Sequence, residues 1–357
     1  MTTAAAGYRN LLEPPELVEL FLRFPPEGFD CARDVGGMPV FRTDFDLLTT
    51  LEKAMRARLA RLPLYGTWSR WLRFATCFAG ATVTEYAPVP AGLLPENLLD
   101  DLLRTRGNKQ SLLICKDLPD DSPLLSSLDN DFAARLAREA GSRGFIEVQG
   151  QALAYVPIDF SSVEEYLARL SGARRKDLRR KMKKRDTVTV DVLPLGDGRF
   201  RDTAVLDEFY AMYLEVFAQS DIHFDLLSRE FFAALLQSRD IGGVVLCYRH
   251  GSELAGYNIC LLHNTMLVDK YIGFKYPLAR DLNLYFISWL VNLEFALENG
   301  LTTYVAGWTD PEVKAGLGAR FTFTRHLVWI KNPLLRRVLF PLRHFFESDT
   351  QAVGERA

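Results

Sequence analysis

The sequence predicts an α/β protein with a mixed sheet, divided into two domains. The chain has 357 residues, which is long for a single hydrophobic core. Residues 241–330 show the order strand, strand, strand, helix, strand. Helical and strand-like segments also alternate through residues 1–150, as they do in α/β folds.

In the first half, helices are expected where apolar residues recur with helical spacing. These segments are 47–62, 96–106 and 130–140. Gly107 and Gly141 follow the last two, as glycines often do at the end of a helix. Short strands are expected at 111–115 and 145–150. No chemical motif stands out here, and we expect an N-terminal domain over residues 1–154.

The pattern changes near residue 155, and the second half is richer in strands. A strand at 154–160 leads to Ser161 and Ser162, which would cap a long helix running to about Arg185. The remaining strands are expected at 188–193, 243–249, 254–262, 265–273, 301–308 and 321–330. The remaining helices are expected at 207–217, 228–237, 282–300 and, broken at Pro341, 332–346. We expect a second domain over 155–346 and a frayed tail at 347–357.

Composition excludes several classes of protein. Apolar residues make up 48% and charged residues 25%, and the net charge of −2 gives no global field for nucleic acid. The five cysteines are scattered without a C-x-x-C pair, which argues against a disulfide framework and against a metal site. We expect a cytoplasmic protein. It shows no signal peptide and no apolar run of about 18 residues, so any membrane contact would be peripheral.

A strongly basic helix is expected at residues 173–186. It carries nine Lys or Arg against two Asp, a local charge of +7, so the rest of the chain sums to −9. So many like charges repel one another unless anions such as phosphates lie between them. Arg175 and Arg179 are therefore candidate substrate-binding residues for the phosphates of CoA, tRNA or a lipid-linked diphosphate. The alternative is a helix face that is only solvated.

The segment 271–286 joins the third strand of the 241–330 region to the long helix. The end of a strand that feeds a helix N-terminus is a common place for anions in α/β sheets. Candidate cofactor-binding residues in this segment are Gly273, Lys275, Arg280, Asn283 and Tyr285. The alternative is a capped loop with surface charges.

A glycine-rich turn follows at residues 307–321. Three glycines within twelve residues suggest that the backbone approaches another group closely. Lys314 would lie one turn into a short helix that begins at Asp310–Pro311, exposed and facing the same cleft as residues 271–285. We predict that Lys314 is catalytic and that Trp308 and Asp310 bind substrate. The alternative is a tight turn with a surface lysine.

Polar residues interrupt the two apolar strands at 254–262 and 265–273. Alternation along a strand would place Asp269 and Tyr271 on one face and Lys270 on the other. Asp269 would then serve as a general base for an attacking amine, and Tyr271 as a general acid. Tyr257 and Asn258 are candidate substrate contacts. Polar pairs on a solvated face are the alternative.

Histidine and the standard catalytic motifs add little. His223 lies in a polar loop before a helix, so it is a candidate substrate contact or a solvated side chain. The sequence has no Ser-His-Asp, H-E-x-x-H or Walker pattern.

Residues 155–335 together resemble the GNAT acyltransferase superfamily, and more closely its Fem-type and CelD-like branch, which includes aminoacyltransferases of peptidoglycan bridges. The order of elements in 241–330 resembles the GNAT core. The basic helix is similar to an R-(K/R)-x-(I/L)-R-R helix of this branch, matched by Arg175, Leu178, Arg179 and Arg180. The branch's signature of a strand, a glycine, a short loop and a lysine is matched by Tyr304, Gly307 and Lys314.

The resemblance implies tandem GNAT-like domains, the first of them degenerate. It implies an enzyme that moves an acyl group to an amine of a small molecule, a sugar or a lipid-linked cell-envelope precursor. The donor would be acyl-CoA as co-substrate or an aminoacyl-tRNA, and the chain lacks the Q/R-x-x-G-x-G/A loop with which ordinary GNAT enzymes hold CoA. Two alternatives remain: a non-catalytic protein that binds RNA or an anionic membrane surface through residues 173–186, and a pseudoenzyme. No oligomeric state is predicted.

Overall fold

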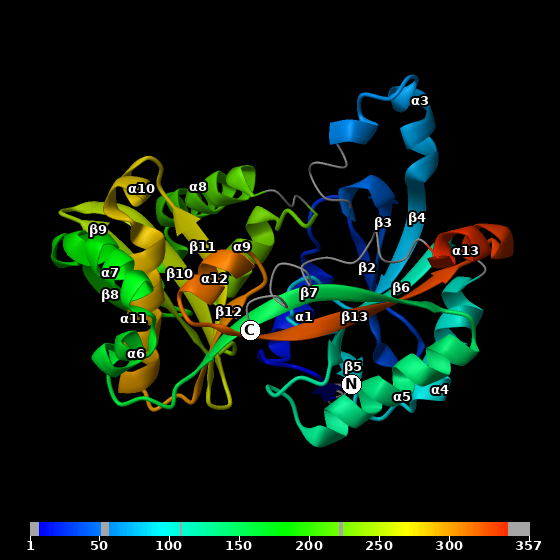
Figure 1. The fold of residues 1–357 in the computed structure, drawn as a ribbon, viewed down its shortest axis with the longest axis horizontal. Helices are drawn as coiled ribbons and strands as arrows, with labels where there is room; N and C mark the ends of the chain where they lie inside the picture. The colour runs from blue at the N-terminus through cyan, green and yellow to red at the C-terminus, as the bar shows by residue number, and fades with distance from the viewer. Residues whose placement is uncertain (1–6, 51–56, 108, 221–223, 342–357) are drawn as a thin grey trace. The chain divides into compact units, whose positions relative to one another are not determined.

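The computed structural model describes residues 7–50, 57–107, 109–220 and 224–341. These residues form two compact units (Figure 1). Among the described residues, unit 1 contains 7–11, 21–152 and 322–341, and unit 2 contains 12–20 and 153–321. Residues 12–20, before the expected boundary at 154, thus belong to unit 2, and residues 322–341, after it, belong to unit 1. The division into domains at residue 154 stays a prediction. The expected frayed tail lies outside the described residues.

Unit 1 is built on a mixed sheet. Its strands, in spatial order, are β2 (Asp30–Arg33), β3 (Pro39–Asp46), β4 (Arg73–Ala79), β6 (Leu112–Asp120) and β13 (Arg320–Ile330). β4 runs parallel to β6, and the other neighbouring strands in this order are antiparallel. A separate two-stranded ladder joins β1 (Tyr8–Arg9) to β5 (Val89–Pro90).

Helices of unit 1 bury leucine and phenylalanine side chains against this sheet. Leu98, Leu99, Phe132 and Leu136 share one core with strand residues such as Leu113. The α-helices are α3 (Tyr65–Trp68), α4 (Pro95–Leu102), α5 (Ser127–Ser142) and α13 (Pro333–Leu339), and α1 (Glu16–Arg23) begins in unit 2. Short helical turns are η1 (Val35–Gly37), η2 (Leu47–Thr50), η3 (Ser69–Leu72) and η4 (Leu103–Gly107).

The structure describes only part of two predicted helices of unit 1. The expected helix over 47–62 begins as the short turn η2 (Leu47–Thr50), and residues 51–56 lie outside the described residues. The expected helix over 332–346 is seen as α13, which ends at Leu339, before Pro341.

Unit 2 has a mixed sheet that confirms the predicted group of strands. The spatial order is β7 (Ile146–Pro157), β12 (Thr303–Gly307), β11 (Met266–Phe274), β10 (Glu253–His263), β9 (Gly243–His250) and β8 (Thr189–Pro194). β11 and β12 are parallel, and the other neighbours are antiparallel. The expected strands at 145–150 and 154–160 are one continuous strand, β7, which begins in unit 1 and ends in unit 2.

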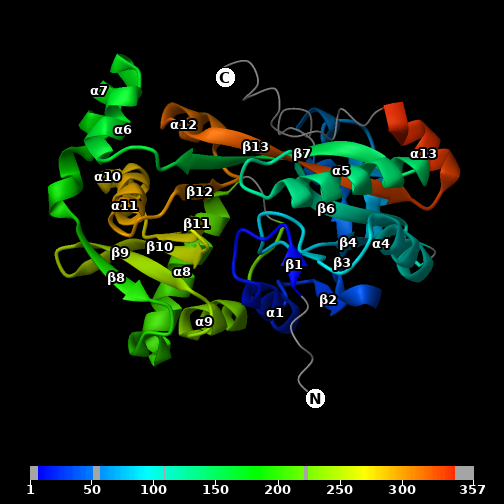
Figure 2. The same cartoon turned by 90° about the horizontal axis from the view of Figure 1, so that it is seen from below.

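Helices cover both faces of the unit 2 sheet (Figure 2). α8 (Thr203–Gln219) and α9 (Arg229–Gln237) lie on one face, where the Phe209 ring stacks on Tyr257. The other face carries α6 (Val163–Arg169), α7 (Gly172–Lys181), α10 (Leu278–Leu282) and α11 (Leu284–Glu298). Two short turns, η5 (Met182–Thr187) and η6 (Gly198–Arg201), and α12 (Pro311–Gly316) complete the unit. None of the helices that the structure describes is both long and apolar enough to span a bilayer.

The predicted helix from Ser162 to Arg185 is broken, because the segment contains two N-caps. The Ser162 side chain accepts a hydrogen bond from the Glu165 amide at the start of α6. Leu170 then leaves the helical conformation, and the Ser171 side chain accepts from the Arg174 amide to begin α7. A similar break at Asn283, whose φ is 55°, separates α10 from α11 within the predicted helix 282–300.

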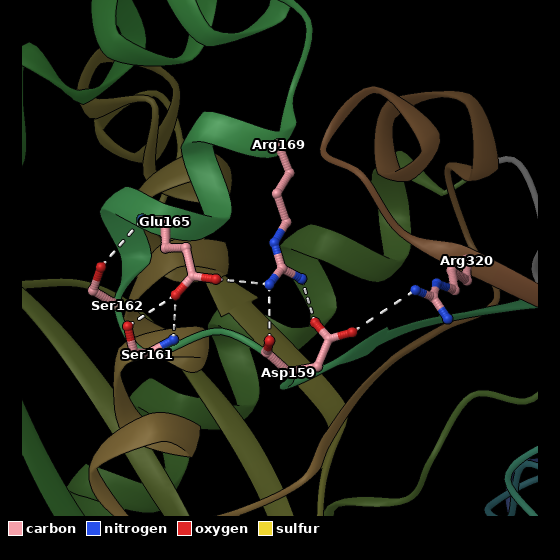
Figure 3. A network of polar contacts seen from close by, with 6 residues as sticks. All are labelled: Asp159, Ser161, Ser162, Glu165, Arg169 and Arg320. Carbon is pink, nitrogen blue, oxygen red and sulfur yellow. Dashed lines mark hydrogen bonds and ion pairs between the residues drawn. The ribbon is translucent and has the colours of Figure 1, made fainter.

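A surface network fixes the start of α6 (Figure 3). The Glu165 carboxylate accepts hydrogen bonds from the Ser161 amide (2.7 Å), the Ser161 hydroxyl (2.8 Å) and the Arg169 guanidinium (2.9 Å). These bonds lower the pKa of Glu165 to about 2. Arg169 also pairs with Asp159, whose carboxylate lies 3.9 Å from Arg320 at the start of β13. The network ties the beginning of α6 to Asp159, which follows β7, and to Arg320, which begins β13.

A β-bulge in β11 overturns the predicted orientation of the polar strand residues. Tyr271 pairs with Ile259, whereas Asp269 pairs with the next residue of β10, Cys260, so Lys270 is an extra residue in the ladder. The bulge shifts the alternation of side chains by one residue. Asp269 therefore faces α11, and Tyr271 packs against aromatic rings of α8 and α9. The prediction that Asp269 and Tyr271 share one face is wrong.

Candidate functional site

A buried polar cluster surrounds Asp269 in the core of unit 2. The Asn258 side-chain amide donates to both carboxylate oxygens, at 2.9 and 2.8 Å. The Asn292 amide (2.9 Å) and the Tyr304 hydroxyl (3.0 Å) donate to Oδ2. The Cys260 sulfur lies 3.8 Å from Oδ1. Asp269 is thus held from β10, α11 and β12 at once.

Burial and charge act on Asp269 in opposite directions. Removal from water raises the pKa of the Asp269 carboxyl, because burial disfavours its charged form. The hydrogen bonds from Asn258 and Tyr304, and the positive charge of Lys314, act to lower that pKa. The arrangement therefore makes Asp269 a fixed group of the core, with each carboxylate oxygen accepting from the protein.

Lys314 lies where β11 and β12 diverge. Their parallel ladder contains the pairs Met266–Thr303, Leu267–Tyr304 and Val268–Val305. Just beyond it, Lys314 Nζ donates a 2.6 Å hydrogen bond to the Ala306 carbonyl. A Cβ added to Gly307 would lie 3.8 Å from the Asp269 carbonyl oxygen and 3.9 Å from that nitrogen, so Gly307 lies close to both groups.

The expectation of an exposed Lys314 is wrong. Only 4% of the residue is exposed, because α12 turns the side chain inward toward the strands. The Asp310 carbonyl accepts from the Lys314 amide at 3.0 Å, which is the first turn of that helix. Since the ammonium hydrogen-bonds a strand carbonyl at the point of divergence, Lys314 contributes to the fold as well as placing a positive charge there.

Tyr285, the second residue of α11, lies near enough to Asp310 and Asp269 for their charges to act on it. Among the described residues its buried hydroxyl has no hydrogen-bond partner. Burial raises the pKa of Tyr285, and the negative charges of Asp310 and Asp269 raise it further. The phenol is therefore protonated at neutral pH and available as a donor. Trp308 is half-buried, and Asp310 is exposed with a φ of 54°.

The segment 275–283 has its charged groups and amides engaged within the protein. Lys275 pairs with Glu253 at 2.5 Å, and Arg280 bonds Gln219 and lies 4.8 Å above the Tyr276 ring. The Tyr276 amide donates to a carboxylate, that of Glu215, at 2.9 Å. The amides of Lys275, Ala279, Arg280, Asp281 and Asn283 donate to carbonyls of the protein. Six amides of the segment are thus engaged within the protein.

Gly273 and Tyr257 fill a packing role. A Cβ on Gly273 would lie 2.2 Å from the Tyr257 ring, so only glycine fits beneath that ring. The Tyr257 hydroxyl is fully buried and donates to the Phe209 carbonyl at 2.8 Å. Neither residue presents a group to a ligand, and both lie on the sheet face covered by α8.

Contacts of the basic segment bring together the motifs that the sequence analysis treated separately. Arg174 donates to the Ala315 carbonyl at 3.3 Å, next to Lys314. Lys181 Nζ lies 3.7 Å from the centre of the Phe286 ring, and Lys184 donates to the Asp281 carbonyl at 2.7 Å. The basic helix, the 271–286 segment and the glycine-rich turn therefore adjoin one another in unit 2.

Three cations form an outward stripe on the basic helix. Lys176, Arg179 and Lys183 are exposed at helical spacing, and none has an ion pair or hydrogen bond within the described part of the chain. Arg175 instead donates to the Ala168 carbonyl at 3.2 Å. The candidate His223 lies outside the described residues.

A second buried charge pair lies on β11. Lys270 Nζ is 2.9 Å from Glu13 Oε1, and their side chains are 6% and 0% exposed. Glu13 precedes α1, so the bulged residue of β11 binds the N-terminal segment of unit 2. Tyr271, the next residue, has a buried hydroxyl and a pKa raised by burial.

Some members of the cluster were not found from sequence. Asn292 and Cys260 were missed, although Asn292 is a visible signal as a polar residue on a helix face of buried apolar ones. Tyr166 was also missed; its hydroxyl bonds the Leu317 carbonyl and accepts from Trp289 Nε1 at 3.1 Å. Within the described ranges no three His, Cys, Asp or Glu side chains gather closely enough to hold a metal ion.

Comparison with known proteins identifies one family and several solved structures of similar fold. A family model named FemAB-like, described as peptidoglycan biosynthesis/recognition, matches residues 104–357. No curated protein matches the chain. Three solved structures of similar fold cover nearly the whole chain. FemX is 12% identical with a TM-score of 0.54, covering 94% of this chain and 96% of its own.

The other two structures come from Bacillus licheniformis and Agrobacterium fabrum. L-PGS from Bacillus licheniformis is 10% identical with a TM-score of 0.53, over 96% of this chain and 98% of its own. The C-terminal domain of a putative lysylphosphatidylglycerol synthetase from Agrobacterium fabrum is 10% identical with a TM-score of 0.52, over 91% and 95%. At these identities the likeness shows a shared fold.

Proposed function

Because the chain belongs to the FemAB-like family of acyltransferases with the GNAT fold, we propose that unit 2 transfers an acyl group to an amine of a cell-envelope precursor. The observation that carries the proposal is the divergence of β11 and β12. There the Lys314 ammonium donates to the Ala306 carbonyl beside Gly307, and the charges of Asp310 and Asp269 act on the Tyr285 hydroxyl, which has no hydrogen-bond partner among the described residues. A divergence lined by a cation and a phenol suits a carbonyl that becomes an oxyanion.

In the proposed reaction the acceptor amine attacks the carbonyl carbon of the donor. A C–N bond forms and the C–O or C–S bond breaks, with its electron pair going to the leaving oxygen or sulfur. The amine loses a proton to solvent or to the exposed Asp310 carboxylate, and the leaving oxygen or sulfur takes up a proton from solvent. Tyr285 donates a hydrogen bond to the developing oxyanion, because its raised pKa keeps it protonated. The Lys314 charge stabilises the same oxyanion. Asp269 is a positioning residue, since its oxygens bind Asn258, Asn292 and Tyr304.

The donor we favour is an aminoacyl-tRNA. The amides of the 275–283 segment are engaged, and the Glu215 carboxylate occupies the Tyr276 amide, where a pyrophosphate would meet a negative charge. A CoA pyrophosphate would lack these amides as donors. The outward stripe of Lys176, Arg179 and Lys183 offers cations to a polynucleotide instead. The family is described as peptidoglycan biosynthesis/recognition, and one structure of similar fold is a domain of a putative lysylphosphatidylglycerol synthetase. Both support a lipid-linked or peptidoglycan precursor as acceptor.

Transfer from charged total tRNA, with acyl-CoAs compared in parallel, tests the proposal. Tyr285→Phe should lower kcat about 100-fold, as loss of an oxyanion donor does, with little change in stability because the hydroxyl has no partner to lose. Full activity of this variant would remove Tyr285 from the mechanism. Transfer from acyl-CoA but not from aminoacyl-tRNA would reverse the donor assignment.

The stripe is tested separately by binding. Lys176→Glu, Arg179→Glu and Lys183→Glu together should weaken tRNA binding by about 100-fold at low salt, with a smaller loss at high salt. The matched control reverses three exposed cations of unit 1 at positions 104, 135 and 138. Equal losses in both triple variants would show that the stripe is not a specific site.

A second candidate function is polyanion binding without catalysis, which the unpaired stripe favours. It predicts tRNA binding that depends on Lys176, Arg179 and Lys183, with no transfer from any donor. Under it, Tyr285→Phe would change nothing measurable.

A further inference from the structure

Two segments of unit 1 are basic and apolar, with no acidic residue. Residues 57–73 contain four arginines, and residues 331–341 contain one lysine and two arginines. Their combined charge is +7 in a chain of net charge −2. We call these two segments the basic–apolar surface.

Exposed apolar side chains concentrate on the basic–apolar surface. Nine large hydrophobic residues are strongly exposed in the described part of the chain, and five of them lie on this surface. They are Leu62, Leu64, Leu334, Val338 and Phe340. Leu64 is 77% exposed and Leu334 is 74% exposed. A scattering of single exposed apolar residues is ordinary, but a concentration of this kind marks an interaction surface.

α13 packs on a hydrophobic cluster of the unit 1 sheet. Leu335 and Leu339 of α13 pack inward on a cluster that also contacts Phe74, at the start of β4, and Leu47. Residues 57–73 run up to the first residue of β4. α3 belongs to this segment and precedes β4 (Figure 1). α13 thus anchors by one apolar face and presents a second one to solvent, with Leu334 and Val338 beside the exposed Arg337.

We propose that the basic–apolar surface docks unit 1 on an anionic lipid membrane. Exposed leucine, valine and phenylalanine side chains would enter the acyl boundary, and the arginines would contact lipid phosphates. An RNA partner would use the arginines but would leave the aliphatic side chains in water. The absence of acidic residues from both segments fits an anionic surface. This proposal does not depend on the acyl transfer proposed for unit 2.

Sedimentation of the full chain with vesicles tests the proposal. We expect binding to vesicles of phosphatidylglycerol and phosphatidylcholine, weakened by salt, and little binding to phosphatidylcholine alone. Leu64→Ser with Leu334→Ser should lower the partition coefficient about tenfold or more. Leu128→Ser is the matched control, because Leu128 is 71% exposed in the same unit, beside Asp129 on α5. That variant should bind like the unchanged chain.

Charge is tested in the same assay. Arg58→Glu with Arg61→Glu should lower vesicle binding about tenfold or more, whereas Arg135→Glu with Arg138→Glu, which has the same spacing on α5, should not. The proposal is overturned if the unchanged chain does not bind anionic vesicles, or if the leucine variants bind them normally. It is also overturned if the arginine variants lose tRNA binding while keeping vesicle binding.

Discussion

Replacing Lys314 by Met tests how the point of divergence between β11 and β12 is held. Met keeps most of the stem but removes the charge and the 2.6 Å hydrogen bond to Ala306. A hydrogen bond from a charged group contributes about 1.5–3 kcal/mol, and breaking a buried charge pair costs about 3–5 kcal/mol. Because Asp269 keeps its bonds from Asn258, Asn292 and Tyr304, we expect the free energy of unfolding to fall by about 2–4 kcal/mol.

Urea denaturation of four chains measures this effect. They are the unchanged chain, Lys314→Met, Asp269→Asn and the double variant. If the two charges stabilise each other, the double variant loses less than the sum of the single losses, by about 1–3 kcal/mol. A Lys314→Met loss below about 0.5 kcal/mol, in the range of ordinary surface changes, would refute the buried role of the lysine. Strict additivity would refute the interaction with Asp269.

The same variants test whether the effect of Lys314 on the free energy of unfolding grows or shrinks as pH rises. Burial raises the pKa of Asp269 above its unfolded value of about 3.9, so the contribution of Asp269 to stability is fully present below that unfolded pKa and is lost as pH rises through the folded pKa. The Lys314 charge opposes this rise. Its removal raises the pKa further, so the stability gap between the unchanged chain and Lys314→Met should widen as pH increases. A gap that widens in acid would contradict this account.

The remaining predictions concern packing, a buried ion pair and a surface carboxylate. Gly273→Ala should lower the free energy of unfolding by about 1–3 kcal/mol or more, whereas Gly172→Ala, where an added methyl meets nothing within 4 Å, should not destabilise the chain. Lys270→Met should cost about 3–5 kcal/mol in urea denaturation, and adding Glu13→Gln should restore part of it. The pKa of Glu165 is lowered to about 2, so its stabilisation is present above its unfolded pKa and is lost as pH falls through about 2. The Tm difference between Glu165→Gln and the unchanged chain should therefore vanish in strong acid.

Hydrophobic pattern predicted the unit 2 sheet well. The expected strands at 243–249, 254–262 and 265–273 are β9, β10 and β11 of one sheet, within one or two residues. The short helix after Asp310 is also confirmed as α12. Apolar alternation and turn residues are local signals, and these elements depend on little else.

Features that depend on distant partners escaped prediction. The bulge at Lys270 is visible only against its partner strand, so simple alternation put Asp269 and Tyr271 on the same face. The burial of Lys314 depends on a carbonyl that the diverging strands leave available. The hydrogen bond that Arg175 donates depends on a carbonyl of α6. That carbonyl lies across a helix break that two serine caps create.

The Lys270–Glu13 pair has a consequence for the order in which the protein is made. Its members are 257 residues apart, so at a synthesis rate of about 5–20 residues per second the acid waits roughly 15–50 s for its partner. Unit 1 likewise needs β13 and α13, which are translated after unit 2. Neither unit can therefore complete its core from an N-terminal fragment. A nascent chain would stay partly open until β13 and α13 have left the ribosome, which makes the last 20 or so described residues decisive for maturation.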